Sequence, residues 1–185
     1  MASSEQIDHW KQDIEAIISR GTRLINGLDS RSFNFKLSPD RWSVAQCISH
    51  LNKVNLLLAP AFREGLEKAP KNETKRLWKP GKFESIFLKV VSPNPPFPVP
   101  VPPPYIPELT AEPEESLEIF IQTHKDLLAC LETARNIDVS KYKITSPAAK
   151  FIKLTVGGWY EGNCIHDNYH LGQAEKVLEE VRASQ

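Results

Sequence analysis

Four stretches of the chain repeat apolar residues at the spacing of an α-helix. The first runs from about Ser4 to Leu28, and its apolar residues share one face: Ile7, Trp10, Ile14, Ile17, Ile18 and Leu24. The second begins near Asp40 or Ser43, because either side chain suits a helix N-cap, and it continues to about Leu66. These two stretches predict two long amphipathic helices, each with one face turned to a core.

Two further helical stretches follow after a long interval. The third runs from about Pro113 to Ala134, and it has acidic residues in its first turn, where they suit the positive end of a helix. The fourth begins between Thr155 and Trp159 and continues to about Arg182, with an apolar stripe of Leu171, Ala174, Val177, Leu178 and Val181. Together the four stretches predict an all-α fold, a four-helix bundle that forms a single domain over residues 1–185.

The interval between the second and third helices, residues 69–112, shows no sustained helical period. Its segment 76–91 predicts a helical turn or two at most. Residues 92–107 hold nine of the fifteen prolines of the chain, which favours extended polyproline II. We interpret this proline strap (residues 92–107) as a stiff crossover packed on the bundle, with Phe97 and Tyr105 as anchors. A PxxP segment that binds a partner is the alternative, but a long crossover also allows neighbouring helices to run parallel.

The charge balance and the lack of long apolar runs argue against nucleic-acid and membrane partners. Lysine plus arginine and aspartate plus glutamate both number 23, so the charge is balanced and no basic face for nucleic acid is expected. The sequence lacks an apolar run long enough to span a membrane, and its first residues do not resemble a signal peptide. Three scattered cysteines, Cys47, Cys130 and Cys164, do not form a disulfide framework. We therefore expect a cytoplasmic protein without nucleic-acid or membrane partners.

The candidate chemistry lies in the histidines. His166 and His170 are four residues apart in HDNYHLGQ, so they share a helix face and can converge on one metal ion. By itself such a pair is more typical of ordinary surface or core residues, and a third ligand has to come from another helix. His50, in WSVAQCISHLN, flanks its apolar stripe as the pair does, so all three can meet at an edge of the bundle. His124 lies inside its stripe and predicts a core histidine, with a ligand role as the alternative, whereas His9 is expected to face solvent.

The second and fourth helical stretches together resemble the DinB/YfiT-like family of metal-binding four-helix bundles. The matching features are a Trp-Ser pair, a His-Leu about eight residues on, and a final His-x-x-x-His-x-Gly-Gln: Trp42, Ser43, His50, Leu51, His166, His170, Gly172 and Gln173. The resemblance implies one divalent metal ion on His50, His166 and His170. Zinc or nickel is the first expectation, and iron or manganese is the alternative. The proline strap is a departure from the family's minimal pattern.

Other residues near these histidines have two interpretations each. Gln173 and Asn163 lie one turn from the histidine pair, where they can support a ligand or a bound water, but packing or surface roles are at least as common. Asp167 is expected to point about 100° away from its neighbour, which makes it a weak candidate. Cys47 lies one turn before His50 and predicts a small buried hydrophobe, with a thiolate ligand as the alternative.

The resemblance also implies a function. Relatives include transferases that join a low-molecular-weight bacterial thiol, such as bacillithiol or mycothiol, to an electrophile, and others resemble metal-dependent hydrolases. The first hypothesis is therefore a metal-dependent thiol S-transferase that acts on a small molecule, with a homodimer as the expected assembly. The second is a non-catalytic bundle that binds a metal or small ligand in a stress response. The third is an interaction protein in which the proline strap is the functional part.

Overall fold

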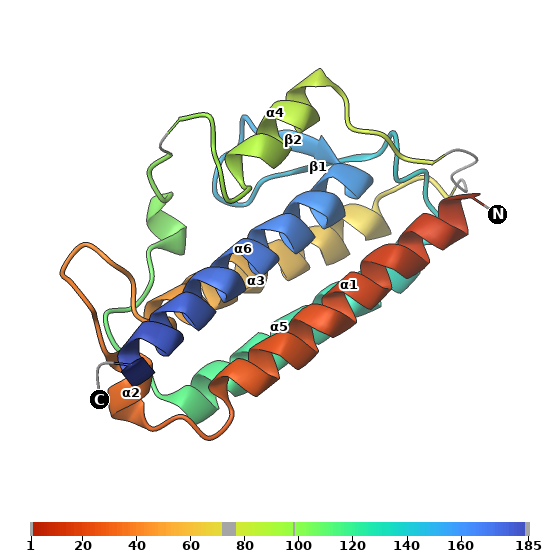
Figure 1. The fold of residues 1–185 in the computed structure, drawn as a ribbon. Coiled ribbons are helices and arrows are strands. Elements are labelled where there is room, and N and C mark those ends of the chain that lie inside the picture. The colour runs from red at the N-terminus through yellow and green to blue at the C-terminus, as the bar shows by residue number, and fades with distance from the viewer. Residues whose placement is uncertain (1, 72–76, 98, 184–185) are drawn as a thin grey trace.

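The computed structural model describes residues 2–71, 77–97 and 99–183. Its four long helices are α1 (Ala2–Ile25), α3 (Val44–Glu67), α5 (Pro113–Ala134) and α6 (Val156–Ala183). They pack side by side along most of the length of the molecule (Figure 1). The predicted four-helix bundle is therefore confirmed, and the helices lie close to the predicted stretches.

The helices form a closed ring in which each helix has two neighbours. The contacting pairs are α1 with α5, α5 with α3, α3 with α6, and α6 with α1. Helices α3 and α5 run parallel, since Asn52 bonds to Ser116 near their starts and Asn55 approaches His124 further along both. Parallel neighbours cannot be joined by a short turn, and the long crossover between α3 and α5 supplies the connection, as predicted.

The core is formed by the apolar stripes that the sequence predicted. Trp10, Phe62 and Phe120 are fully buried, and so is the stripe of α6, which comprises Leu171, Ala174, Val177, Leu178 and Val181. The indole of Trp10 stacks on Tyr160 with ring centroids 5.9 Å apart, and its Nε1 donates a hydrogen bond to Glu161. These contacts hold α1 against α6. They also give the buried indole N–H of Trp10 a hydrogen-bond acceptor, which buried tryptophans usually have.

Smaller elements lie at both ends of the bundle (Figure 1), and several of them differ from expectation. The segment expected to hold a turn or two contains a nine-residue helix, α4 (Lys82–Val90). A short helix, α2 (Ser30–Asn34), lies in the predicted turn region, and an antiparallel hairpin of β1 (Lys143–Thr145) and β2 (Lys153–Thr155) lies in the predicted loop before α6. Helix α2 lies near the C-terminus, and α4 and the β1–β2 hairpin lie toward the other end. Three-residue strands are too short to give a periodic signal, because pairing and packing decide strand formation more than the intrinsic preference of the residues does.

Helix α4 is fixed to the start of α6 by a buried carboxylate. Glu84 accepts hydrogen bonds from the backbone N–H of Gly81, 3.0 Å away, and of Thr155, 2.8 Å away. It is also close to Gly158, where any side chain would collide with the Glu84 carboxylate. This contact holds α4 and the β1–β2 hairpin above α3 and α6 at the same end of the bundle (Figure 1).

The proline strap packs against α3 through its last residues. The Lys53 ammonium donates to the carbonyl of Ile106 at 2.8 Å, and the backbone N–H of Glu108 donates to the Ser49 hydroxyl at 2.9 Å. Tyr105, in the short 3-10 helix η1 (Pro103–Tyr105), is half-buried as expected of an anchor. Phe97 is 53% exposed, so the second predicted anchor is wrong, and Pro98 lies outside the described residues.

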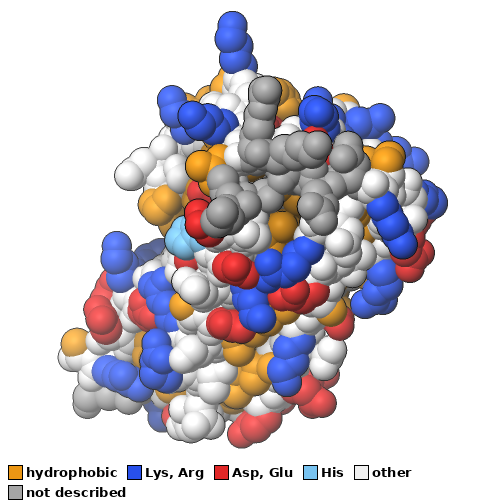
Figure 2. Space-filling model, turned by 90° about the vertical axis from the view of Figure 1, so that its right-hand side faces the viewer, with side chains coloured by type: hydrophobic (Ala, Val, Ile, Leu, Met, Phe, Trp, Pro, Cys, Tyr) orange, Lys and Arg blue, Asp and Glu red, His pale blue; other side chains and the backbone are white. Residues whose placement is uncertain are grey.

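The outer surface carries charges of both signs. Figure 2 shows lysine and arginine side chains interspersed with aspartate and glutamate over one face of the molecule, with hydrophobic side chains between them. None of the helices in the described part of the chain has the length and apolar content needed to cross a membrane.

Helix α3 begins at a buried capping box, which gives a first prediction. The Ser43 hydroxyl accepts from the backbone N–H of Gln46 at 3.1 Å, and the Gln46 side chain accepts from the backbone N–H of Ser43 at 3.2 Å. We expect Ser43→Ala to lower the free energy of unfolding by about 1 kcal/mol, because a buried N–H loses its acceptor. Urea denaturation measures this change, and a loss below about 0.3 kcal/mol would show that the cap contributes little.

Candidate metal centre

Three histidines from two helices meet at one point. His50 lies on α3, and His166 and His170 lie on adjacent turns of α6. One ring nitrogen of each lies within 4.8 Å of those of the other two, and the Nε2 atoms of His50 and His166 are 3.1 Å apart. The antiparallel packing of α3 against α6 thus brings together the three residues that the sequence singled out.

Two of the three rings are oriented by hydrogen bonds at Nδ1. His50 Nδ1 donates to the backbone carbonyl of Tyr105 at 2.7 Å, and His170 Nδ1 donates to Oε1 of Gln173 at 3.0 Å. In both rings Nε2 is then the nitrogen with a free lone pair for the cluster. Trp42 packs on both rings, with centroids 5.1 Å from His50 and 5.5 Å from His170.

The donor set fits a divalent cation. Two unprotonated Nε2 atoms 3.1 Å apart repel each other unless a proton or a cation lies between them. Nitrogen ligands at a usual zinc distance of about 2.1 Å are separated by about 3.4 Å in a tetrahedral site, close to the spacing seen here. Three histidines also leave at least one position for water or substrate, which is the form of a catalytic site rather than a closed structural one.

Asp167, a weak candidate from sequence, lies beside the cluster. Its carboxylate is buried, with Oδ2 3.1 Å from Nε2 of His124 and Oδ1 3.5 Å from Nδ1 of His166. The predicted turn of about 100° directs the side chain toward α5, and there His124 faces it. Burial alone raises the pKa of Asp167, but hydrogen bonds with His124 and then His166 outweigh burial and hold this pKa well below its usual range.

His124 and Cys47 do not join the cluster. His124 is fully buried, as predicted, and its Nδ1 donates to the carbonyl of Phe120 at 2.6 Å. It therefore positions Asp167 and is separated from the three histidines by that carboxylate. Burial raises the pKa of the Cys47 thiol to about 12, so this cysteine is a neutral thiol at pH 7 and a poor metal ligand.

The three histidines line a cavity of about 470 Å³, large enough for a small molecule. Its other walls come from α4, the β1–β2 hairpin, the proline strap and further residues of α3, α6 and the loop before α3. They are largely apolar and include Trp42, Val54, Phe87, Val101, Ile152 and Trp159. The ionisable side chains among its described lining residues are the three histidines, Tyr105, Tyr169 and Asp40. The cluster is thus placed where a substrate can reach it.

The comparisons with known proteins agree with this architecture. The sequence profile of the DinB superfamily matches residues 13–174. The chain belongs to the DinB superfamily. Its fold is similar to that of YfiT from Bacillus subtilis, with a TM-score of 0.64 and 17% identity over 97% of this chain and 90% of YfiT. YfiT is described as a probable metal-dependent hydrolase with an unusual four-helix bundle topology. No curated protein gives a significant match.

Asn163 adds a polar group to the cavity of this DinB-superfamily bundle. Its amide nitrogen donates to Oδ1 of Asn55 at 2.9 Å, and its own Oδ1 is buried without a hydrogen-bond donor among the described residues. Because Asn163 also lines the cavity, this oxygen can accept a hydrogen bond from a bound molecule. The sequence placed Asn163 on the histidine face, and the structure agrees.

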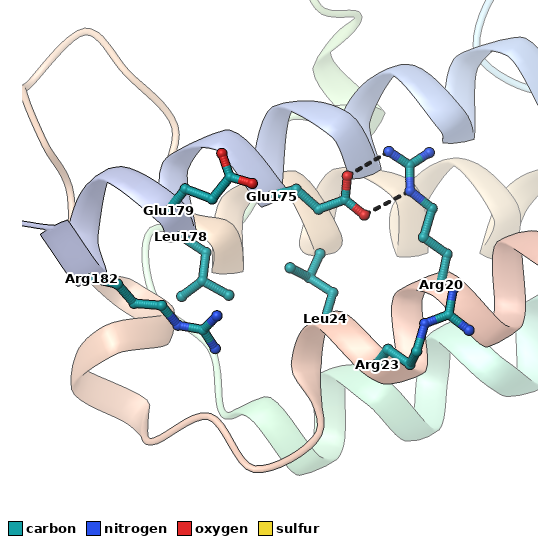
Figure 3. Close-up of a pocket in the computed structure, with 7 residues that line it drawn as sticks. All are labelled: Arg20, Arg23, Leu24, Glu175, Leu178, Glu179 and Arg182. Atoms are coloured by element: carbon teal, nitrogen blue, oxygen red, sulfur yellow. Dashed lines mark hydrogen bonds and ion pairs between the residues drawn. The ribbon is translucent and has the colours of Figure 1, made fainter.

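A second, smaller pocket of about 200 Å³ lies between α1 and α6 and carries no such chemistry. Figure 3 shows its charged side chains, with Arg20 paired to Glu175 through two hydrogen bonds of 2.7 and 2.6 Å. The remaining lining residues are Arg23, Leu24, Leu178, Glu179 and Arg182. The described residues of this pocket do not include three side chains that converge as metal ligands, and Arg20 with Glu175 forms an ion pair between α1 and α6.

The cluster makes stability depend on pH in the metal-free protein. Burial, followed by the nearby His166, lowers the pKa of His50 to about 4, and burial, followed by His166 and His50, lowers that of His170 to about 3. The unfolded chain takes up protons below pH 6.5 that the folded chain does not, so stability falls as the pH falls from 6.5 toward 4. For the two rings together we expect a loss on the order of 4 kcal/mol between pH 7 and pH 5.

Urea denaturation with a chelator present measures this loss. The double variant His50→Gln, His170→Gln is the control, because it removes both titrating rings and should flatten the pH dependence. An equally steep dependence in the double variant would show that other groups cause it.

Proposed function

We propose that His50, His166 and His170 bind one divalent metal ion and that the protein is a metal-dependent enzyme acting on a small molecule. The observation that carries this proposal is the convergence of three imidazoles, two of them held by Nδ1 hydrogen bonds, at the wall of a cavity. Imidazole ligands favour zinc or nickel, with iron or manganese as the alternative.

The proposed reaction is transfer of a low-molecular-weight thiol to an electrophile. A divalent ion bound by the histidines would act as a Lewis acid and lower the pKa of a thiol or a water. The thiol loses its proton to solvent, its sulfur bonds to the electrophilic carbon, and the bond from that carbon to the leaving group breaks. The apolar walls from α4 and the proline strap exclude water, which favours attack by sulfur over attack by water.

Hydrolysis is the second candidate. It is supported by the likeness in fold to YfiT, described as a probable metal-dependent hydrolase. The third candidate is a bundle that binds a metal or small ligand without catalysis. It is supported by the state of Asp167, the carboxylate nearest the cluster, which is already bonded to His124 and is not available as a general base. The homodimer and the cytoplasmic location stay predictions.

Activity assays on protein reconstituted with zinc or nickel separate the three candidates. One assay follows the loss of free thiol with 1-chloro-2,4-dinitrobenzene as electrophile, and a second follows hydrolysis of p-nitrophenyl acetate. We expect metal-dependent thiol transfer that disappears in His170→Ala. Ester hydrolysis alone would favour the hydrolase, and bound metal without either activity would favour the non-catalytic bundle.

A further inference from the structure

Away from the proposed metal, the described lining of the cavity holds no side chain that neutralises a negative charge. Lysine and arginine are absent from its described lining residues, and Asp40 contributes a negative charge of its own. A carboxylate or phosphate away from the histidines would therefore be buried without a counter-charge, which is strongly unfavourable.

The proline strap makes one wall of the cavity a poor donor of hydrogen bonds. Pro95, Pro100 and Pro102 line the cavity and have no backbone N–H. Val101 lies between two of them with its side chain half-buried. The adjoining carbonyl of Tyr105 is already the acceptor for His50. This wall therefore offers apolar surface but no proline N–H donor for an anionic oxygen.

Two described residues that line the cavity have a buried side-chain atom without a hydrogen-bond partner, Nδ1 of His166 and Oδ1 of Asn163, and the amide oxygen is an acceptor. Oδ1 of Asn163 receives no hydrogen bond from the described residues, and the Asn163 side chain is 94% buried. A ligand satisfies this oxygen by presenting an N–H or O–H group. The apolar walls, the absence of cationic side chains among the described lining residues and the unpaired acceptor all favour an uncharged or cationic molecule with a hydrogen-bond donor.

From these three features we infer that the substrate is a small, largely apolar molecule without net negative charge, which presents a hydrogen-bond donor to Asn163. This inference rests on the proposed function, because a thiol or other head group would approach the metal held by the three histidines. Among low-molecular-weight thiols it selects neutral ones over those with carboxylates. The proline strap is then the part of the chain that sets this selectivity.

A matched pair of thiols tests the inference. Methyl 4-(mercaptomethyl)benzoate and 4-(mercaptomethyl)benzoic acid differ in one negative charge, and both are titrated into cobalt-loaded protein while the thiolate-to-cobalt absorption is followed. We expect the ester to bind at least about tenfold more tightly than the acid. Val101→Lys places a cation on the strap wall and should reduce that ratio about tenfold. Leu109→Lys adds the same charge at a side chain that is 78% exposed and outside the cavity, and should leave the ratio unchanged.

The outcomes separate this inference from the proposed function. Metal content is measured on the same samples, and protein that binds no cobalt overturns both. Cobalt-loaded protein that binds the acid as tightly as the ester overturns the inference alone. Cobalt-loaded protein that binds neither thiol overturns the inference and also contradicts the proposed thiol transfer. A ratio that falls equally in Val101→Lys and Leu109→Lys would assign the selectivity to net charge rather than to the strap, and would also overturn it.

Discussion

We expect His170→Ala to reduce the metal content of the purified protein from about one divalent ion per chain to near zero. The histidine ring is close to both other members of the cluster, with centroids 4.6 Å from His50 and 4.6 Å from His166. The two remaining rings lie on different helices and make a weak two-ligand site. The loss of affinity should exceed the roughly 10–100-fold that removal of a supporting group costs, because a ligand itself is lost.

Elemental analysis of untagged protein measures this result, with and without reconstitution by zinc, nickel or manganese. His9→Ala is the control, since the His9 side chain is 67% exposed on α1 and pairs only with Asp13 among the ion pairs described. Circular dichroism on both variants shows whether the bundle is intact. Wild-type protein that holds no metal after reconstitution, or His170→Ala that retains a full equivalent, would contradict the three-histidine site.

The helices and the histidine pair could be predicted from sequence because both depend on local spacing. The stripe from Leu171 to Val181 repeats at helical intervals, and the i, i+4 spacing of His166 and His170 places both on one face whatever surrounds them. The assignment of His50 required more. The spacing of residues in its helix does not distinguish a metal ligand from an ordinary histidine. The resemblance to the DinB family, carried by both helices together, assigned His50 to the same site as the pair.

The parts that were missed depend on contacts between distant segments. The expected direction of Asp167 was correct. Its role as the partner of His124 could not be predicted, because that depends on the packing of α5, which brings in a residue 43 positions earlier in the chain. The carbonyl of Tyr105 orients His50 from the strap, although nothing in a proline-rich sequence indicates which carbonyl faces α3. Phe97 shows the opposite error, since an aromatic residue among prolines suggests an anchor and the fold leaves it exposed.

The proline strap contributes both to the arrangement of the helices and to the candidate site. It allows α3 and α5 to run parallel, it holds the ring of His50 through Tyr105, and it forms a wall of the cavity. The strap is bonded to α3 at Lys53, and Glu108, directly after the strap, is bonded to Ser49, so bonds lie on either side of His50 in α3. Movement of the strap would therefore change the position of His50 in the cluster. The connection between helices is therefore also part of the candidate site.

Asp167→Ala is expected to weaken metal binding about 10–100-fold and to lower the free energy of unfolding by about 2–5 kcal/mol. Asp167 is the acceptor nearest to Nδ1 of His166, a buried atom without a closer partner, so its removal frees the ring to rotate and to change tautomer. The same change leaves Nε2 of His124 without its carboxylate partner in a fully buried position. The separation of 3.5 Å between Asp167 and His166 should shorten when Nε2 of His166 binds a cation and its Nδ1–H becomes more acidic.

Competition with a chromophoric chelator measures the affinity, and urea denaturation measures the stability. Asp167→Asn separates the two effects, because its amide oxygen can still accept from Nδ1 of His166 and should restore part of the metal affinity. Asn168→Ala is the neighbouring control, since Asn168 is exposed and its side chain bonds to Arg20 and to the Cys164 carbonyl, away from the histidines. Nitrogen-15 spectra of the imidazoles in zinc-loaded protein report the tautomer of His166 directly. Unchanged affinity and an unchanged His166 spectrum in Asp167→Ala would show that the carboxylate stabilises the fold without positioning the ligand.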